Sequence, residues 1–385
     1  MKKKLSVLLA VVLLAAAALA GCSGGGGGND VEDEDVIKIG SVSPTTGPVA
    51  TFGQSVLDAT KLAFEEINAK GGVLGGKKLL LLNEDNQSKG EETGAAFRKL
   101  IEQEKVVAIL GSVTTGDSLI GAPIAQEAKI PMLTPTSTAP AVTEVGDYIF
   151  RACFLDNYQS EAMATFAVEE LNAKTAAIIK QSDSDYSVGL AEFFAKTFEA
   201  AGGKIVAEES YLESDIDFSA ILTNVKAAKP DVIFLPAYYD TVGPIMQQAR
   251  AAGIEAKFLG VDGMDSSELF SLAQGAEEGA YFSNHYSPAA DVELVQHFLK
   301  AYEEKYGKTP DALAALAYDA AYIMAQAIDE AGSTEPQAIR DALANISYTG
   351  VSGNVTFDEN RNPVKPIWVN VIKDGKYEVA KVVEP

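Results

Sequence analysis

Hydrophobic and polar positions alternate with two different periods along most of this chain. From Val36 onward, short runs rich in β-branched and aliphatic residues are separated by longer segments whose apolar residues share one helical face. The short runs predict strands at 37–42, 78–83, 106–110, 176–180, 204–209, 231–236 and 257–259. The longer segments predict helices at 54–70, 90–104, 116–127, 157–172, 187–201, 217–228 and 241–252. This alternation is typical of βα units, so we expect an α/β fold with parallel sheets.

The pattern starts afresh near Asp156, as if one βα domain were followed by another. Glycines at 71–72, 202–203 and 253 follow three of the helices, as C-terminal caps do. Two long helical patterns, at 291–306 and 311–331, come after the second set of strands. Two last strands, at 367–373 and 377–383, flank Asp374-Gly375, a pair that favours a hairpin turn. Periodicity alone does not assign these late elements to either domain.

The first 35 residues have a different pattern. Three lysines precede an apolar run from Leu5 to Ala20, and Leu19-Ala20-Gly21-Cys22 resembles the lipobox of bacterial lipoproteins. We therefore predict a lipoprotein signal peptide at 1–21 and a flexible tether, glycine-rich and then acidic, at 22–35. Lipidation of Cys22 would anchor the protein to the bacterial cell membrane, because two or more acyl chains hold a protein stably. An ordinary signal peptide with an incidental cysteine is the alternative.

Composition narrows the functional classes. The formal net charge is −23, and removal of the three signal-peptide lysines would lower it to −26, so nucleic acid is an unfavourable partner. Apart from Cys22, the chain contains one cysteine, Cys153, so we expect no intramolecular disulfide. No second stretch has the roughly 20 apolar residues that a membrane-spanning helix needs. We therefore expect an extracytoplasmic protein that is tethered and not integral.

The sequence offers little for catalysis. His285 and His297 are its two histidines, and there is neither a Gly-x-Ser-x-Gly nucleophile elbow nor a His-Glu-x-x-His metal helix. His297 falls on the amphipathic helix at 291–306 and is expected at the surface. These observations argue against an enzyme, and we expect no cofactor and no metal site.

Several segments, in order, resemble the branched-chain amino-acid-binding proteins of ABC transporters. They span nearly the whole chain after the tether, and their order and spacing carry the resemblance. The segments are Ile39-Gly40, Thr46-Gly47-Pro48-Val49-Ala50, Phe52-Gly53, Ile67-Asn68-Ala69-Lys70-Gly71-Gly72, Ile109-Leu110-Gly111-Ser112, Thr134-Pro135-Thr136-Ser137-Thr138-Ala139-Pro140, Gln248-Ala249-Arg250-Ala251-Ala252-Gly253 and Gly260-Val261-Asp262-Gly263.

This resemblance implies a two-lobed type I periplasmic-binding fold, in which each lobe is a mainly parallel sheet flanked by helices. Three crossovers, near Asp156, Asn284 and Val355, would join the lobes. The N-terminal lobe would comprise 37–155 plus 284–355, and the C-terminal lobe 156–283 plus 356–385. The ligand would lie between the lobes, at the carboxyl ends of the strands.

Hydroxyl residues of the N-terminal lobe are the candidates for the carboxylate of an amino acid. Thr114 and Thr115 lie in a turn that leads into a helix, where free backbone N–H groups and the helix dipole favour an anion. The resemblance implies that Thr115 binds the ligand, whereas the alternative is that both threonines only cap the helix. It also implies that Thr138 contacts the carboxylate and the ammonium, that the Thr136 carbonyl accepts from the ammonium, and that Ser137 lies in the same loop. The alternative is a plain proline-bounded loop.

Asp262 and three aromatic residues are the candidates for the rest of the ligand. Asp262 matches the acidic residue that binds the ammonium, although the family pattern has the longer glutamate there; the alternative is a turn aspartate. Phe52, Tyr186 and Tyr238 would surround the ligand side chain, and Phe52 replaces a tyrosine of the pattern, which favours an apolar ligand. The alternative is that these rings belong to the core.

The resulting hypothesis is a monomeric, lipid-anchored solute-binding protein. It would capture leucine, isoleucine or valine by hinge closure and deliver it to the permease of an ABC importer. Two alternatives stay open: a receptor that presents its ligand to a sensory membrane partner, and a binding protein for amides, short peptides or aromatic acids.

Overall fold

A computed structural model describes residues 35–290 and 292–385, and residues 36–385 form one compact unit. The predicted signal peptide, the lipidation site Cys22 and nearly all of the tether lie outside the described residues. Within the described part of the chain, no helix is long and apolar enough to cross a bilayer.

The first sheet is parallel throughout and has the strand order β2-β1-β3-β4-β5. The short strands β3, β4 and β5 are buried along their whole length, as expected where helices cover both sides of a parallel sheet. Its strands are β1 (Val36–Ser43), β2 (Lys78–Asp85), β3 (Ala108–Gly111), β4 (Met132–Thr134) and β5 (Ile149–Arg151).

The second sheet has seven strands in the order β14-β13-β10-β9-β8-β6-β7. Strands β6 to β10 run parallel, and the C-terminal hairpin adds β13 and β14 in antiparallel pairing. The strands are β6 (Thr175–Gln181), β7 (Lys204–Tyr211), β8 (Val232–Leu235), β9 (Lys257–Gly260), β10 (Tyr281–Asn284), β13 (Ile367–Lys373) and β14 (Lys376–Val383). The Asp374-Gly375 turn is confirmed, and both residues have the positive φ that a type I′ hairpin turn requires.

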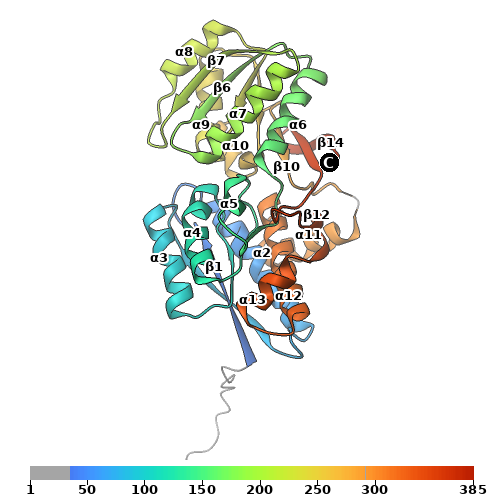
Figure 1. Ribbon diagram of the computed structural model, residues 1–385. Coiled ribbons are helices and arrows are strands. Elements are labelled where there is room, and N and C mark those ends of the chain that lie inside the picture. The colour runs from blue at the N-terminus through green and yellow to red at the C-terminus, as the bar shows by residue number, and fades with distance from the viewer. Residues whose placement is uncertain (1–34, 291) are drawn as a thin grey trace, which may run out of the picture. The chain divides into compact units, whose positions relative to one another are not determined.

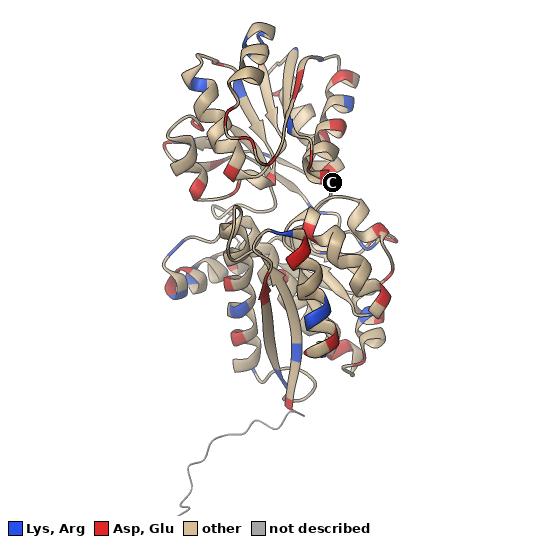
Figure 2. Ribbon diagram, turned by 90° about the vertical axis from the view of Figure 1, so that its left-hand side faces the viewer, with Lys and Arg blue, Asp and Glu red and all other residues tan. Residues whose placement is uncertain are grey.

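Each sheet with its helices forms one lobe. Figure 1 shows the second lobe above the first. The first lobe contains α2 (Ala50–Ala69), α3 (Gly90–Arg98), the π-helix η2 (Lys99–Gln103), α4 (Thr115–Ala128), α5 (Ala141–Glu144), α11 (Glu293–Tyr306), α12 (Ala312–Ala331), α13 (Pro336–Leu343) and the hairpin β11 (Ser347–Gly350) with β12 (Gly353–Thr356). The second lobe contains α6 (Asp156–Glu169), α7 (Asp185–Ala200), α8 (Ser219–Ala228), α9 (Tyr239–Ala251), the 3-10 turn η3 (Asp262–Met264) and α10 (Glu268–Ala273). Figure 2 shows acidic and basic residues distributed over both lobes.

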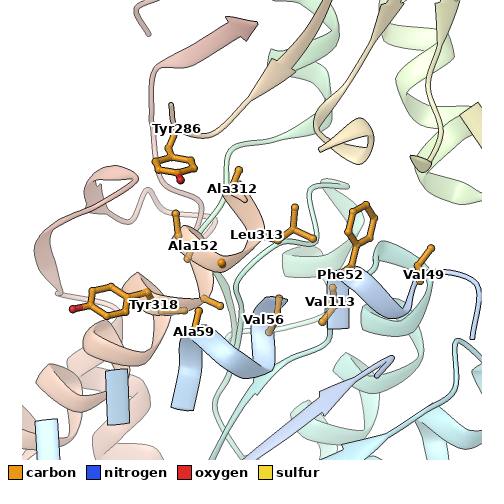
Figure 3. Packing of buried hydrophobic residues seen from close by; sticks show 14 of the residues in the cluster. Val49, Phe52, Val56, Ala59, Val113, Ala152, Tyr286, Ala312, Leu313 and Tyr318 are labelled. Atoms are coloured by element: carbon orange, nitrogen blue, oxygen red, sulfur yellow. The ribbon is translucent and has the colours of Figure 1, made fainter. Parts of the chain in front are cut away.

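The chain passes between the lobes three times, after β5, after β10 and after β12. Helix α12 returns to the first lobe and packs along α2, because an alanine-rich face allows close approach. Figure 3 shows this junction, with Phe52 and Val56 on α2 near Leu313 on α12. The late helices therefore belong with the first lobe and the C-terminal hairpin with the second. The single-residue domain limits given above stay predictions.

All seven strands predicted before residue 260 are confirmed, and so are the last two. The prediction missed β4, β5, β10 and the hairpin of β11 and β12, which are three or four residues long. It also missed the short helices α5, α10 and α13. Segments of this length contain few positions in which a period of 2 or 3.6 can be recognised, although the four-residue strands β3, β8 and β9 were predicted.

Candidate functional site

A cavity that is partly open to solvent lies where the carboxyl ends of the strands of both sheets face each other. In each lobe it adjoins the point at which the strand order reverses, between β1 and β3 and between β6 and β8, where open α/β sheets bind ligands. Eight of the nine predicted ligand-binding residues line it. The lining residues are Phe52, Val113, Thr114, Thr115, Thr136, Thr138, Tyr186, Tyr238, Asp262, Gly263 and Leu313.

The first lobe contributes hydroxyl groups at the start of α4. Thr114 caps the helix, since its Oγ1 accepts from the Asp117 amide at 3.3 Å and donates to Asp117 Oδ2 at 2.8 Å. Thr115 Oγ1 is buried and has no hydrogen-bond partner among the residues that the structure describes. The capping interpretation therefore describes Thr114, whereas Thr115 lines the cavity with an unpartnered hydroxyl. The N-terminal end of α4 favours an anionic group beside it.

The loop after β4 holds three hydroxyl residues in different environments. Thr136 Oγ1 donates to the Val113 carbonyl at 2.5 Å. Ser137, the predicted residue that does not line the cavity, bonds to Ser118 Oγ at 2.7 Å and to the Thr114 carbonyl at 2.9 Å. Its side chain therefore joins this loop to the α4 turn. The Thr138 carbonyl accepts from the Asp156 amide at 3.0 Å, which connects the cavity wall to the start of α6.

Asp262 is the acidic group of the cavity and lies directly after β9 in the second lobe. The residue is 5% exposed, and its carboxylate accepts three hydrogen bonds. Oδ1 accepts from the Tyr186 hydroxyl at 2.6 Å and from Gln159 Nε2 at 2.9 Å, and Oδ2 lies 3.0 Å from His285 Nε2. Burial lowers the pKa of His285, so the imidazole is neutral. These three donors are uncharged, so they do not neutralise the negative charge of Asp262.

Asp156 is a second buried carboxylic acid next to this network. Gln159 Nε2 also donates to Asp156 Oδ1 at 2.9 Å, so one amide joins the two carboxyl groups. Burial, and then the charge of Asp262, raise the pKa of Asp156 to about 7. Sequence reasoning missed Asp156, Gln159 and His285 as site residues, because an Asp-x-x-Gln pair at a helix start and a histidine after a strand have no distinctive pattern.

Aromatic rings form the apolar part of the cavity wall. Tyr186 and Tyr238 stack with ring centroids 4.7 Å apart, and Phe52 meets Tyr238 edge-on at 5.6 Å. A Cβ atom at Gly263 would lie 2.9 Å from the Tyr186 hydroxyl, so glycine is required for this packing. Leu313, at the start of α12, completes the wall. Sequence reasoning did not identify Leu313 as a site residue.

Direct contacts join the lobes beside the cavity. Thr51 Oγ1 lies 3.1 Å from Ser266 Oγ, and the Tyr239 hydroxyl donates to the Pro48 carbonyl at 3.2 Å. These contacts hold the two lobes together next to the cavity. Among residues 35–290 and 292–385, no group of three His, Cys, Asp or Glu side chains is arranged to hold a metal ion.

Comparisons with known proteins agree with this architecture. The family described as "Periplasmic binding protein" matches residues 36–376. A Pseudomonas aeruginosa protein named leucine-, isoleucine-, valine-, threonine-, and alanine-binding protein is 30% identical over 327 residues, which cover 84% of this chain and 86% of that protein. The crystal structure of leucine binding protein LivK from Thermotoga maritima aligns with a TM-score of 0.87 and 38% identity, and covers 91% of this chain and 99% of that chain.

The structure of LivJ, a branched-chain amino acid transporter substrate binding protein from Streptococcus pneumoniae in complex with isoleucine, aligns with a TM-score of 0.86 and 34% identity. The alignment covers 91% of this chain and 100% of the LivJ chain. The two-lobed architecture with parallel-dominated sheets is thus the type I periplasmic-binding fold. By the length of the family match and by its similarity to these relatives, the chain belongs to the periplasmic binding protein family of solute-binding proteins, which are not enzymes.

Proposed function

We propose that this protein captures leucine, isoleucine or valine between its lobes and delivers it to an ABC importer. The observation that carries this proposal is the presence of two polar groups of opposite preference in one cavity, which both lobes line. Asp262 supplies a buried negative charge with uncharged donors only, and Thr115 supplies an unpartnered hydroxyl at a helix N-terminus. An α-amino acid carries the two complementary charges, an ammonium and a carboxylate, a few ångströms apart.

The apolar wall supports a branched aliphatic side chain as the third recognition element. Phe52, Leu313 and the stacked Tyr186 and Tyr238 are buried or nearly so, and no lysine or arginine of the described part of the chain lines the cavity. The named ligands of the similar proteins support the same ligand class.

Hinge closure is the proposed mechanism of capture. Ligand groups contact both lobes, so the ligand stabilises the closed arrangement over the open one by its differential affinity. The three crossings supply the hinge, and the contacts of Thr51 with Ser266 and of Tyr239 with Pro48 add to the closed form. The permease then recognises the closed form.

Calorimetric titration of the protein without its first 35 residues tests the ligand class. We expect leucine, isoleucine and valine to bind more tightly than alanine, because burial of a leucine-sized side chain contributes about 1.5–3 kcal/mol. Glutamate and lysine should bind worst, since the apolar wall has no charge partner for them. Tightest binding of glutamate, of lysine or of an aromatic acid without an amine would refute the proposal and leave the family assignment intact.

Membrane attachment through Cys22 is a separate part of the proposal. The family places the protein outside the cytoplasm, and the lipobox-like segment supports an acyl anchor. Cys22→Ser should move the protein from the detergent phase to the aqueous phase in detergent partitioning. Equal partitioning of the wild type and this variant into the aqueous phase would exclude the anchor.

A further inference from the structure

A buried polar network behind the cavity connects Asp262 to two of the segments that join the lobes. We propose that Gln159 and His285 are positioning residues that orient the Asp262 carboxylate, leave one of its acceptor sites open to the cavity, and thereby set the preference for a ligand that bears an ammonium. This inference rests on the proposed function and adds to it the residues that determine specificity. The network includes Asp156, Gln159, Asp262, Ser283 and His285.

His285 is held between the hinge segments. It follows β10 at the second crossing, is fully buried, and stacks on Phe154 of the first crossing with ring centroids 3.6 Å apart. Its Nε2 faces Asp262 Oδ2 at 3.0 Å, whereas its buried Nδ1 has no partner within residues 35–290 and 292–385. The ring therefore cannot rotate away from Asp262 without losing the stack on Phe154.

The tautomer of His285 follows from these two contacts. With the proton on Nε2, the ring donates a hydrogen bond to the Asp262 carboxylate, and Nδ1 is an unpaired acceptor. With the proton on Nδ1, a buried donor would be bare and two acceptors would face each other at 3.0 Å. The charged groups that act on the ring are Asp262, which raises its pKa, and the buried Lys365, which lowers it together with burial. The Nε2–H tautomer is the arrangement that agrees with all of these contacts.

Gln159 has its amide orientation determined by its partners. Its Oε1 accepts from the backbone amide of Asp262 at 3.3 Å and from Ser283 Oγ at 2.7 Å. A backbone N–H can only donate, so the oxygen must lie on that side and Nε2 must face the carboxyl groups of Asp156 and Asp262. Every hydrogen-bonding group of the Gln159 side chain is thus used.

The acceptor capacity of Asp262 explains how this network would select a ligand. A carboxylate has about four acceptor sites. Tyr186 and Gln159 use Oδ1, and His285 uses one site of Oδ2, so a single site on Oδ2 is left for the ligand. All three protein donors are neutral. A ligand ammonium at the fourth site would therefore be the first positively charged donor to bond to the Asp262 carboxylate. Loss of His285 or Gln159 would let the carboxylate rotate and would admit water as a competing partner.

Affinities for a matched ligand pair test the proposal. L-leucine and 2-hydroxy-4-methylpentanoate differ in the amine, so a general structural defect weakens both, whereas loss of positioning weakens leucine more. We expect His285→Ala, His285→Asn and Gln159→Ala to lower the ratio of the two affinities at least tenfold. His285→Gln should keep the ratio within about threefold of the wild type, because its amide nitrogen can reach the position of Nε2. The Asn variant is the matched control, since its shorter amide reaches only the Nδ1 position.

An unchanged ratio in both His285→Asn and Gln159→Ala would overturn the positioning role. Circular dichroism confirms that each variant is folded, and the Asn and Gln variants at 285 carry the comparison if His285→Ala does not fold. Asp262→Asn separates this failure from failure of the proposed function. If it abolishes leucine binding while the other variants keep the ratio, positioning alone is wrong; if leucine binding survives in Asp262→Asn, the proposed function is wrong.

Nuclear magnetic resonance tests the tautomer without any ligand. The chain has two histidines, so His297→Gln leaves His285 as the single imidazole. We expect the nitrogen shifts of a neutral Nε2–H ring that do not change between pH 6 and pH 8. A signal of the Nδ1–H tautomer, or of a ring that is charged in this range, would overturn the assignment.

Discussion

The two lobes share a strand order but supply opposite chemistry to the cavity. The order β2-β1-β3-β4-β5 of the first sheet recurs as β7-β6-β8-β9-β10 in the second. The first lobe contributes hydroxyl groups and a helix N-terminus, whereas the second contributes Asp262 and two tyrosines. Topology thus determines where a ligand can be bound, and the residues that follow each strand determine which pole of the ligand lies there.

The difference comes from turns that follow different strands of the two sheets, β3 in the first sheet and β9, the counterpart of β4, in the second. In the first lobe α4 starts four residues after β3, so Thr115 lies at the free end of a fourteen-residue helix. In the second lobe β9 runs into the three-residue turn η3, which opens with Asp262, and the next helix starts only at Glu268. A helix end favours an anion, and a carboxylate held by neutral donors favours a cation.

Removal of the Asp262 charge, the negative pole of the cavity, should have the largest effect on leucine affinity. Asp262→Asn keeps the size of the side chain but removes its charge, so we expect leucine affinity to fall by about 2–5 kcal/mol, the usual loss for one side of a buried charge pair. This is roughly 30-fold to several-thousand-fold in calorimetry. Asp240→Asn, an aspartate on α9 that does not line the cavity, is the control and should bind leucine normally. Equal affinities in both variants would remove Asp262 from the site.

Asp156, the buried acid at the start of α6, should make the free energy of unfolding depend on pH. The pKa of Asp156 is raised from 3.8 to about 7, so between these values the folded state binds a proton more tightly than the unfolded chain. Stability therefore falls as the pH rises towards 7, by roughly 2–3 kcal/mol between pH 5 and pH 7. Asp156→Asn should lose this decrease. Urea unfolding of both proteins at pH 5, 6, 7 and 8 measures it, and other acids such as Asp240 cancel in the difference.

Parallel pH dependences in the wild type and Asp156→Asn would contradict the assignment of a raised pKa to Asp156. The comparison is made without ligand, so that its outcome is independent of the binding function.

The positive pole of the first lobe should be weaker than the negative pole of the second. Thr115→Val removes an unpartnered hydroxyl, and a hydrogen bond to a charged ligand group contributes about 1.5–3 kcal/mol. Leucine affinity should fall roughly 10-fold to 150-fold, while Thr115→Ser, which keeps the hydroxyl, should stay near the wild type. Equal losses in Val and Ser variants would indicate that packing and not the hydroxyl matters at this position.

The apolar wall should give the smallest effect. Leu313→Ala removes part of the surface that would bury the ligand side chain, so leucine affinity should fall by about 1–2 kcal/mol and alanine affinity by less. Ile323→Ala, at a fully buried position farther along the same helix, should lower stability without changing the ratio of leucine to alanine affinity. A changed ratio of leucine to alanine affinity in the Ile323 variant would mean that the packing of α12 as a whole, and not the Leu313 side chain, determines the preference for leucine.

The sequence predicted the polar groups of the site better than their supporting structure. Thr115 and Asp262 follow predicted strands directly, and the carboxyl ends of parallel strands meet at one edge, so a local pattern and a family resemblance were sufficient to suggest them. Ser137 belongs to the same loop as Thr136 and Thr138, yet it bonds to the neighbouring turn and does not line the cavity. The direction of a side chain within a loop depends on backbone angles that periodicity does not reveal.

The sequence by itself determined the α/β class, the two sets of βα units, the C-terminal hairpin and the strand ends at which the polar residues gather. These features depend on local periodicity and turn residues, which each segment carries on its own. Only the tertiary structure decided that Leu313 joins the cavity wall and that Gln159 and His285 hold Asp262. These residues are 103 and 23 positions away from Asp262. Their roles arise because the chain crosses between the lobes three times and brings distant segments into one buried network, which no local pattern encodes.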